Sequence, residues 1–384
     1  MSVVITGASG FLGSHVLREL LAEDAREPVT VLGRGAPDDL RARVESAVAS
    51  LPGPPLAPGA LGRVRYLGAD LALPGLGLGV EDRTRVTAGM TELWHCAALT
   101  NLQGDPARLF EANVRGTRAV LELADGAPEA QLLHVSTAFV AGKRRSGHVM
   151  EDDLSEAEGF QTYYEETKYT AERMVRDWAG RDGRVATVLR PSMLVSDRPA
   201  SGGSPEQTLD VVVRLIDDVL NSRREAADEE VAALVPACGG ALPFRIMGVP
   251  DAVMNAVQVD YAARAMMRVA AARGANPAPG VRTVHVTHPR NTPFEALKEA
   301  LEMIFPGLRL SLLPTVPAPA RHEAFAMAHW SQLVGFSAQA RTYDRAHLLE
   351  DLACTGGLPD PAPLDSAYLK RATDRRSVAV AGIS

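Results

Sequence analysis

The feature of this sequence that most restricts its fold is a glycine-rich turn near the N-terminus, Thr6-Gly7-Ala8-Ser9-Gly10-Phe11-Leu12-Gly13. The β-branched run Val3–Thr6 leads into it, and hydrophobic residues then recur at helical spacing. A glycine turn between a strand and a helix is typical of parallel α/β sheets that bind a dinucleotide. We expect Gly7 to permit the sharp turn, Gly10 to let the backbone approach a pyrophosphate, and Gly13 to let the helix pack close to the sheet.

The start of that helix is the predicted phosphate site. Its free N–H groups and the positive end of its dipole favour an anion. The residues expected to contact the cofactor there are Thr6, Gly7, Ser9, Gly10, Phe11, Leu12 and Gly13.

The first half of the chain alternates short β-branched runs with helical patterns. This alternation indicates a parallel sheet with helices on both faces. The predicted fold class is therefore α/β, a doubly wound (Rossmann) sheet with a smaller, partly helical C-terminal substrate domain. The expected strands are Val3–Thr6, Val29–Gly33, Val64–Gly68, Glu92–Cys96, Leu132–Ser136 and Ala186–Arg190.

The alternation stops after Pro191, which divides the chain into two regions. We expect residues 1–198 to form the nucleotide-binding domain and residues 199–384 the substrate-binding region, with parts of 255–290 returning to the first domain. The later elements expected are a helix over Asp210–Arg223, a turn-rich segment over Ala237–Pro250, a strand and helix over Asn255–Ala272, a strand over Thr283–Thr287 and a helix over Thr292–Ile304.

The end of the second strand predicts which cofactor is bound. Domains that prefer NAD carry an acid there, about 20 residues beyond the glycine turn, to bind the ribose 2′-hydroxyl. This chain has Arg34 instead, and a guanidinium can hold a 2′-phosphate through two bonds. The sequence therefore predicts NADP (NADPH), bound by Arg34 and, as a second candidate, Arg43; a solvated loop arginine is the alternative. We expect Asp70 and Leu71 at the adenine edge, although Asp70 also fits an ordinary strand-ending acid.

Tyr164 and Lys168 form the candidate catalytic pair. They lie four residues apart in a segment with a helical pattern, so both side chains leave one face. A tyrosine hydroxyl has an ordinary pKa of about 10 and needs a nearby cation to act as an acid or base near neutrality. Lys168 would supply that charge and could also bind the nicotinamide ribose. Alone, the pattern also fits an exposed pair, but here it follows Ser136 and Thr137, whose hydroxyls end a parallel strand.

Composition and charge argue against several other classes of protein. The net charge of -7 disfavours a general nucleic-acid surface, and the short basic run Lys143-Arg144-Arg145 does not change this. No apolar run approaches the roughly 20 residues that span a bilayer, and the first strand begins too early for a signal peptide. The 3 cysteines have no metal or disulfide spacing, and Cys96 in its apolar run is interpreted as structural. We expect a cytoplasmic protein with no metal site, no membrane span and no nucleic-acid partner.

With the glycine turn, Ser136-Thr137 and the Tyr164/Lys168 pair, the chain resembles the extended short-chain dehydrogenase/reductase superfamily over at least residues 1–200. The resemblance implies that Thr137 orients the substrate carbonyl and that Ser136 is structural. It also implies cofactor contacts after the fourth strand, on the next helix and after the sixth strand. Those residues are Ala97, Ala98, Asn113, Pro191 and Ser192, together with Tyr164 and Lys168.

Within that superfamily, Asp70–Leu78, Trp94–Ala98 and Ser136–Gly142 resemble the thioester-reductase branch, with a weaker likeness over Val257–Ala262 and Val284–Pro289. This branch includes the terminal reductase domains of nonribosomal peptide and polyketide synthetases, carboxylic acid reductases and fatty acyl-CoA reductases. The resemblance implies hydride transfer from NADPH to an acyl thioester, held on a carrier protein or coenzyme A, which releases an aldehyde or alcohol. The sequence contains no carrier or adenylation domain, so we expect a tethered substrate to arrive from another chain.

Other functions remain open at this stage. The main alternative is an extended short-chain dehydrogenase that acts on a small ketone or alcohol. A sugar epimerase fits less well, because Arg34 argues against NAD. A redox-sensing regulator that binds NADP without turnover would not require Tyr164 and Lys168.

Overall fold

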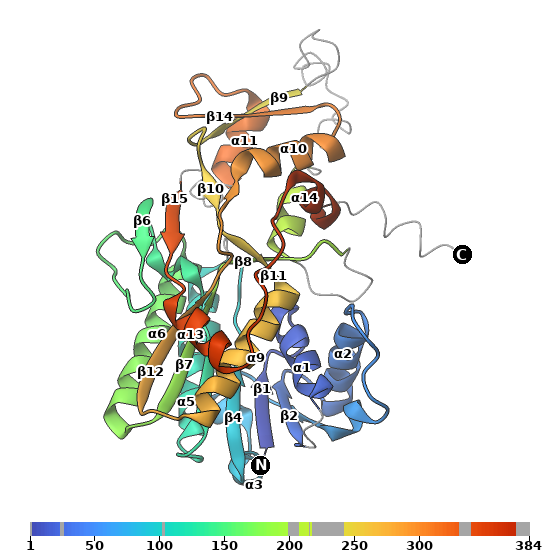
Figure 1. Cartoon of the computed structure of the whole chain (residues 1–384), viewed down its shortest axis with the longest axis vertical. Helices are drawn as coiled ribbons and strands as arrows, with labels where there is room; N and C mark the ends of the chain where they lie inside the picture. Colours follow the sequence, from blue (N-terminus) through green and yellow to red (C-terminus); the bar gives the residue numbers. More distant parts are fainter. Residues whose placement is uncertain are drawn as a thin grey trace.

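A seven-stranded parallel sheet forms the centre of the molecule (Figure 1). The computed structural model describes residues 2–23, 27–101, 104–198, 207–214, 216, 242–329 and 339–373. The strand order is β12-β7-β5-β4-β1-β2-β3, and β1 lies between β4 and β2. The chain therefore winds outward from β1 in both directions, and the predicted doubly wound α/β fold is confirmed. The strands are β1 Ser2–Thr6, β2 Val29–Gly33, β3 Val64–Gly68, β4 Met90–His95, β5 Gln131–Val135, β7 Val185–Pro191 and β12 Gly280–Val286.

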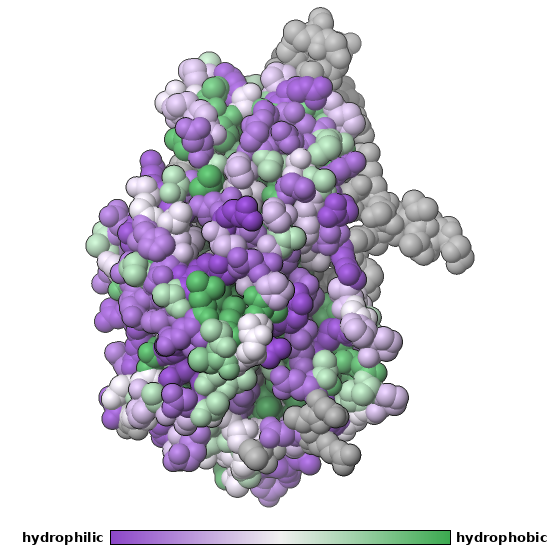
Figure 2. Space-filling model, viewed as in Figure 1, coloured by the Kyte–Doolittle hydropathy of each residue, from purple (hydrophilic) through white to green (hydrophobic). Residues whose placement is uncertain are grey.

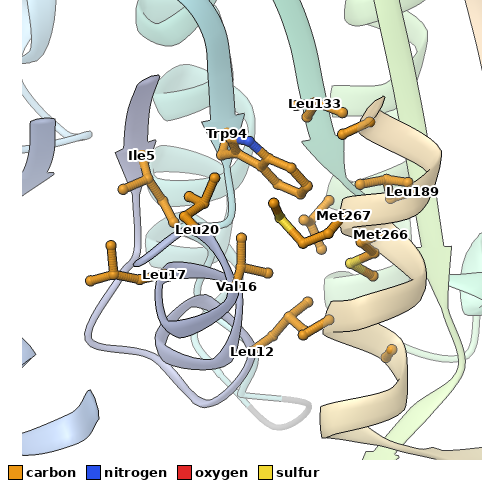
Figure 3. Packing of buried hydrophobic residues seen from close by; sticks show 14 of the residues in the cluster. Ile5, Leu12, Val16, Leu17, Leu20, Trp94, Leu133, Leu189, Met266 and Met267 are labelled. Carbon is orange, nitrogen blue, oxygen red and sulfur yellow. The ribbon is translucent and has the colours of Figure 1, made fainter. Parts of the chain in front are cut away.

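Helices cover both faces of this sheet, so its strands are rich in buried aliphatic residues, as expected for a parallel sheet. One face packs against α1, α2, α9 and α13, and the other against α3, α5 and α6. Figure 3 shows α1 and α9 side by side beneath the sheet, with Leu12, Val16 and Leu20 facing Met266 and Met267. The helices are α1 Phe11–Ala22, α2 Pro37–Ala49, α3 Val80–Thr87, α4 Pro106–Phe110, α5 Gly116–Ala124, α6 Tyr163–Asp182, α9 Val259–Ala275 and α13 Ala346–Cys354.

A second, smaller hydrophobic cluster lies beyond the carboxyl ends of the strands, in the upper part of Figure 1. It includes residues of β9 (Leu242–Met247), β14 (Leu308–Leu313), α10 (Phe294–Ile304) and α14 (Ser366–Thr373). Strands β9 and β14 pair in parallel, and α11 (Arg321–His329) packs beside β9. The elements that could cover a substrate thus face the edge of the sheet where open α/β folds bind ligands.

Strand β9 corrects one expectation, because it lies inside the segment Ala237–Pro250 that was predicted to be turn-rich. Leu242 and Phe244 alternate with Pro243, and both hydrophobic side chains are buried. The partner strand comes from residues 308–313, far along the chain, so local composition could not indicate the pairing. Of the helix predicted over Asp210–Arg223, residues 210–214 and 216 are helical, and the remainder lies outside the described residues.

Three short strand pairs connect distant parts of the chain. These are β6 (Ser146–Val149) with β15 (Ala340–Tyr343), β8 (Met193–Val195) with β11 (Ala256–Gln258), and β10 (Val253–Met254) with β13 (Thr292–Pro293). Hydrophilic residues cover most of the face seen in Figure 2. Among the described residues, no helix is both long and apolar enough to span a bilayer.

Candidate active site

The glycine turn between β1 and α1 is a tight backbone cradle. Gly7 has a φ of +75°, in the left-handed region that favours glycine, and a Cβ there would lie 2.6 Å from the backbone nitrogen of Ala97. A Cβ on Gly13 would collide with the Gly7 carbonyl. We expected Gly13 to let α1 pack close to the sheet, but the atoms that a Cβ there would meet belong to the turn itself. A Cβ on Gly10 would meet only the Gly7 oxygen, at 3.2 Å.

Helix α1 begins with backbone donors that have no acceptor among the described residues. The N–H of Ser14 bonds to the Gly10 carbonyl, but within the described residues nothing accepts a bond from the N–H of Phe11, Leu12 or Gly13. The first turn of the helix carries no acidic side chain. Such a helix start fits the pyrophosphate of a dinucleotide, and the glycine cradle leaves the backbone accessible to it.

Arg34 and Arg43 lie side by side at the carboxyl end of β2. Both side chains are exposed, and the Arg43 guanidinium donates a hydrogen bond to the Arg34 carbonyl. No ion pair to either guanidinium is found in the part of the chain that the structure describes. Two exposed guanidinium groups that have no ion-pair partner among the described residues fit a phosphate ligand.

Asp70 and Leu71 begin a compact turn after β3. The Asp70 carboxylate accepts a bond from the Ala72 N–H at 3.0 Å, and Leu71 packs so closely on α5 that a Cβ on Gly116 would lie 2.8 Å from its own Cβ. Asp70 thus stabilises the turn.

Asn113 fixes the turn that follows β4. It is 2% exposed and lies in a π-helical stretch, Glu111–Arg115, a feature frequent at functional sites. Its amide oxygen accepts from the Leu99 N–H at 2.7 Å, and its amide nitrogen donates to the Leu99 carbonyl at 3.0 Å. The same nitrogen donates to the Thr167 hydroxyl at 3.0 Å. Asn113 therefore connects the turn containing Ala97 and Ala98 with helix α6.

The three predicted catalytic residues meet at the carboxyl end of β5. The Thr137 hydroxyl lies close to the Tyr164 hydroxyl. Lys168, one turn further along α6, is 3% exposed and donates to the Val135 carbonyl at 2.6 Å. The Thr137 oxygen also lies 3.5 Å from the Pro191 carbonyl. Nearby, Ser192 is 4% exposed, and its hydroxyl has no partner among the described residues.

The electrostatics of this group depend on burial. Burial lowers the pKa of Lys168 to about 8, while the negative charge of Glu172 opposes the change. Burial and the charge of Glu165 raise the pKa of Tyr164 above its ordinary value, and the hydrogen bond with Thr137 acts in the opposite direction. Burial also raises the pKa of Cys96 to about 12, so its thiol is a poor nucleophile, consistent with a structural role.

A buried ion-pair network behind the site was not found by sequence reasoning. The Glu172 carboxylate accepts bonds from Arg190 at 2.6 and 3.0 Å, from Arg176 at 3.0 Å, and from the Ser136 hydroxyl at 3.0 Å. Glu172 and Arg190 are both 0% exposed. The Ser136 side chain therefore has a structural partner. Lys168, Glu172 and Arg176 follow one another at intervals of four residues, which places them on one face of the helix. This spacing could have indicated the network.

The basic run after β5 is only partly available to a partner. The Arg144 guanidinium is bound to the Asp153 carboxylate at 3.1 Å and the His148 carbonyl at 2.7 Å. Lys143 and Arg145 are exposed. Arg341, 2% exposed, donates to the carbonyls of residues 142 and 144 and so holds this loop against β15.

With this geometry in view, the chain can be compared with known proteins. The model of an NAD-binding family described as "Male sterility protein" matches residues 5–266. The isonitrile lipopeptide synthase of Streptomyces coeruleorubidus is 32% identical over 195 residues, which are 50% of this chain and 13% of that protein. The L-2-aminoadipate reductase large subunit of Penicillium chrysogenum is 27% identical over 306 residues, 75% of this chain and 20% of that protein. The chain thus spans only a small part of these relatives' length.

Among solved structures, the terminal R domain from the myxalamid PKS-NRPS biosynthetic pathway has a TM-score of 0.73 at 22% identity. The likeness covers 100% of this chain and 91% of that domain. At this identity the likeness shows a shared fold.

Proposed function

The chain belongs to the NAD-binding Male sterility protein family, within the thioester-reductase branch of the extended short-chain dehydrogenases/reductases, and on that premise we propose that it reduces acyl thioesters with NADPH. It is an oxidoreductase with a nicotinamide cofactor. The observation that carries the proposal is the meeting of Thr137, Tyr164 and Lys168 at the carboxyl end of β5, on the same edge of the sheet as the glycine cradle that follows β1.

The residues present fit the cofactor. The N–H groups that begin α1 would bind the pyrophosphate, Arg34 and Arg43 the 2′-phosphate, and Lys168 the nicotinamide ribose. When bound, NADPH supplies the hydride. The turn that follows β4 would line the cofactor site. Asn113 holds this turn in place, because it bonds to the backbone of Leu99 through both amide atoms.

Thr137 and Tyr164 act on the substrate carbonyl. Their hydroxyl groups donate to the carbonyl oxygen and stabilise the negative charge that develops when the carbonyl carbon gains a hydride. Tyr164 then gives its proton to that oxygen, which yields a hemithioacetal, and the Lys168 ammonium stabilises the remaining tyrosinate. When the carbon–sulfur bond breaks, the sulfur leaves as a thiol and an aldehyde forms. Incubation with NADPH and an acyl thioester should therefore release free thiol.

The names of the relatives support a substrate class. Two of them are named a lipopeptide synthase and an aminoadipate reductase, and a structural neighbour is the terminal R domain of a PKS-NRPS pathway. We infer that the acyl group is carried as a thioester on a carrier protein or coenzyme A, in natural-product biosynthesis.

Replacing Arg34 by Ala should weaken NADPH binding selectively. Each lost charge-assisted bond to the 2′-phosphate is worth about 1.5–3 kcal/mol, so we expect a loss of about tenfold or more in NADPH affinity and little change for NADH. Fluorescence titration of both cofactors measures this. Arg41→Ala is the matched control, because Arg41 is an exposed arginine of α2 that pairs with Glu45. Equal affinity of the wild type for NADPH and NADH would overturn the cofactor proposal.

Reversing the exposed charges at Lys143 and Arg145 should impair a carrier-bound substrate. If an acidic carrier protein docks beside the loop that follows Thr137, the double variant Lys143→Glu/Arg145→Glu should raise KM for acyl-carrier substrate at low salt. A short thioester mimic should be turned over as before. Arg144 is left unchanged because it holds the loop. Arg85→Glu, at an exposed arginine of α3, is the control, and an equal KM increase there would refute the docking site.

A further inference from the structure

His95 is a buried histidine with a bonding partner on each ring nitrogen. It ends β4, is 2% exposed, and belongs to none of the predicted sites. Its Nδ1 lies 2.9 Å from the Thr6 hydroxyl oxygen, in the glycine turn, and its Nε2 lies 3.1 Å from the Thr117 hydroxyl oxygen, on α5. His95 therefore connects the end of β1 with the helix that follows Asn113.

The direction of these bonds can be determined from their neighbours. The Thr117 hydroxyl donates to the Asn113 carbonyl at 2.6 Å, so it can only accept from His95, whose Nε2 must carry the hydrogen. Burial, together with the charge of Lys168, lowers the pKa of His95 to about 3, so the ring is neutral. Its Nδ1 is therefore an acceptor, and the Thr6 hydroxyl donates to it. Thr6 in turn accepts from the Ala97 N–H at 3.3 Å.

The chain of bonds continues to the catalytic helix. The Asn113 side chain donates to the Thr167 hydroxyl at 3.0 Å, and Thr167 donates to the Tyr164 carbonyl at 2.9 Å. Thr6, His95, Asn113, Thr117 and Thr167 are all buried. Buried hydrogen bonds in such a chain strengthen one another, and each donor would be costly to leave unpaired.

We propose that His95 is a positioning residue that couples the nucleotide turn to helix α6, through Thr6 on one side and Thr117 and Asn113 on the other. In its Nε2-protonated form it keeps the glycine cradle and the turn that Asn113 fixes in a constant relative position. The bound nicotinamide and the Tyr164 hydroxyl then meet the same substrate carbonyl. The inference rests on the proposed function only for its turnover measurement; cofactor titration tests it without any substrate.

His134 provides a matched control within the same fold. It lies next to His95, with the ring centroids 5.3 Å apart, and is 0% exposed. Neither of its ring nitrogens has a hydrogen-bond partner among the described residues. Replacing each histidine by Phe therefore removes a buried imidazole of the same size, but only His95→Phe breaks the chain of bonds.

The experiment compares His95→Phe, His134→Phe and Thr117→Val in NADPH titration and in turnover at 25 °C. His95→Phe and Thr117→Val should each weaken NADPH binding about 3- to 10-fold and lower kcat, because buried bonds are lost. The double variant should be no worse than His95→Phe alone. His134→Phe should leave both quantities unchanged. If His95 had only a structural role, His95→Phe would lower the urea midpoint of unfolding and leave NADPH affinity and kcat unchanged.

Two results would overturn the proposal. One is NADPH affinity and kcat in His95→Phe that match those of His134→Phe. The other is an NMR spectrum of histidine-labelled protein in which His95 carries its hydrogen on Nδ1, a readout that does not depend on whether any variant folds. If the wild type binds NADPH but reduces no thioester, the proposed function fails, while the titration and the NMR measurement still decide the role of His95.

Discussion

Replacing Tyr164 by Phe should lower kcat by about 10²- to 10⁴-fold, the usual contribution of a general acid. The substitution removes the hydroxyl that lies close to Thr137 and that we propose as the proton donor to the substrate oxygen. It leaves the ring in place on α6 and does not touch the donors that begin α1, so NADPH affinity should be nearly unchanged. Steady-state turnover and cofactor titration measure the two quantities separately.

Tyr163→Phe is the matched control for this experiment. Tyr163 is the neighbouring tyrosine on the same helix, and it is 53% exposed. Its hydroxyl should contribute nothing to turnover. Unchanged turnover in Tyr164→Phe, or an equal loss in Tyr163→Phe, would remove Tyr164 from the mechanism.

Replacing Glu172 by Gln should destabilise the protein by about 3–5 kcal/mol at neutral pH, the usual cost of leaving one member of a buried ion pair uncompensated. Arg190 is fully buried and loses the carboxylate that it contacts at 2.6 Å. Urea unfolding measures the loss. Glu166→Gln, at an exposed glutamate of α6, should change the free energy of unfolding little. A loss no larger than that of Glu166→Gln would contradict the network's structural role.

The same substitution should change two pH dependences. Although burial alone would raise it, pairing with Arg190 and Arg176 holds the pKa of Glu172 below its ordinary value of 4.5. The stabilisation is therefore present above pH 4.5 and is lost as the pH falls below it, so wild type and Glu172→Gln should converge in stability on acidification. Because the charge of Glu172 raises the pKa of Lys168, the alkaline limb of the kcat profile should move to lower pH in the variant.

Much of the fold could be predicted from the sequence, because the signals were local. The turn from Gly7 to Gly13 requires glycine for steric reasons, and the β-branched runs of the central strands are buried on both faces. Tyr164, Lys168 and Thr137 were found because a helical spacing and a strand end are both visible in the sequence. The structure then brings them together at one edge of the sheet.

The features that sequence reasoning missed depend on contacts between distant residues. The pairing of β9 with β14 joins residues 66 positions apart, and the Glu172 network joins α6 to β7 through Arg190. His95 looked like part of an apolar run, and only its contacts with Thr6 and Thr117 support the role that we propose for it. Arg144 looked like a free surface charge until its bond to Asp153 was seen.

The most direct test of the central proposal is to incubate the protein with NADPH and acyl thioesters of varied chain length, on coenzyme A and on a carrier protein, and to follow three products. We expect oxidation of NADPH together with release of free thiol in equal amount and of an aldehyde or alcohol, with Tyr164→Phe inactive in the same assay. Simple ketones and alcohols serve as the comparison substrates. Turnover of these comparison substrates without consumption of any thioester would contradict the account and favour a short-chain dehydrogenase that acts on small ketones or alcohols.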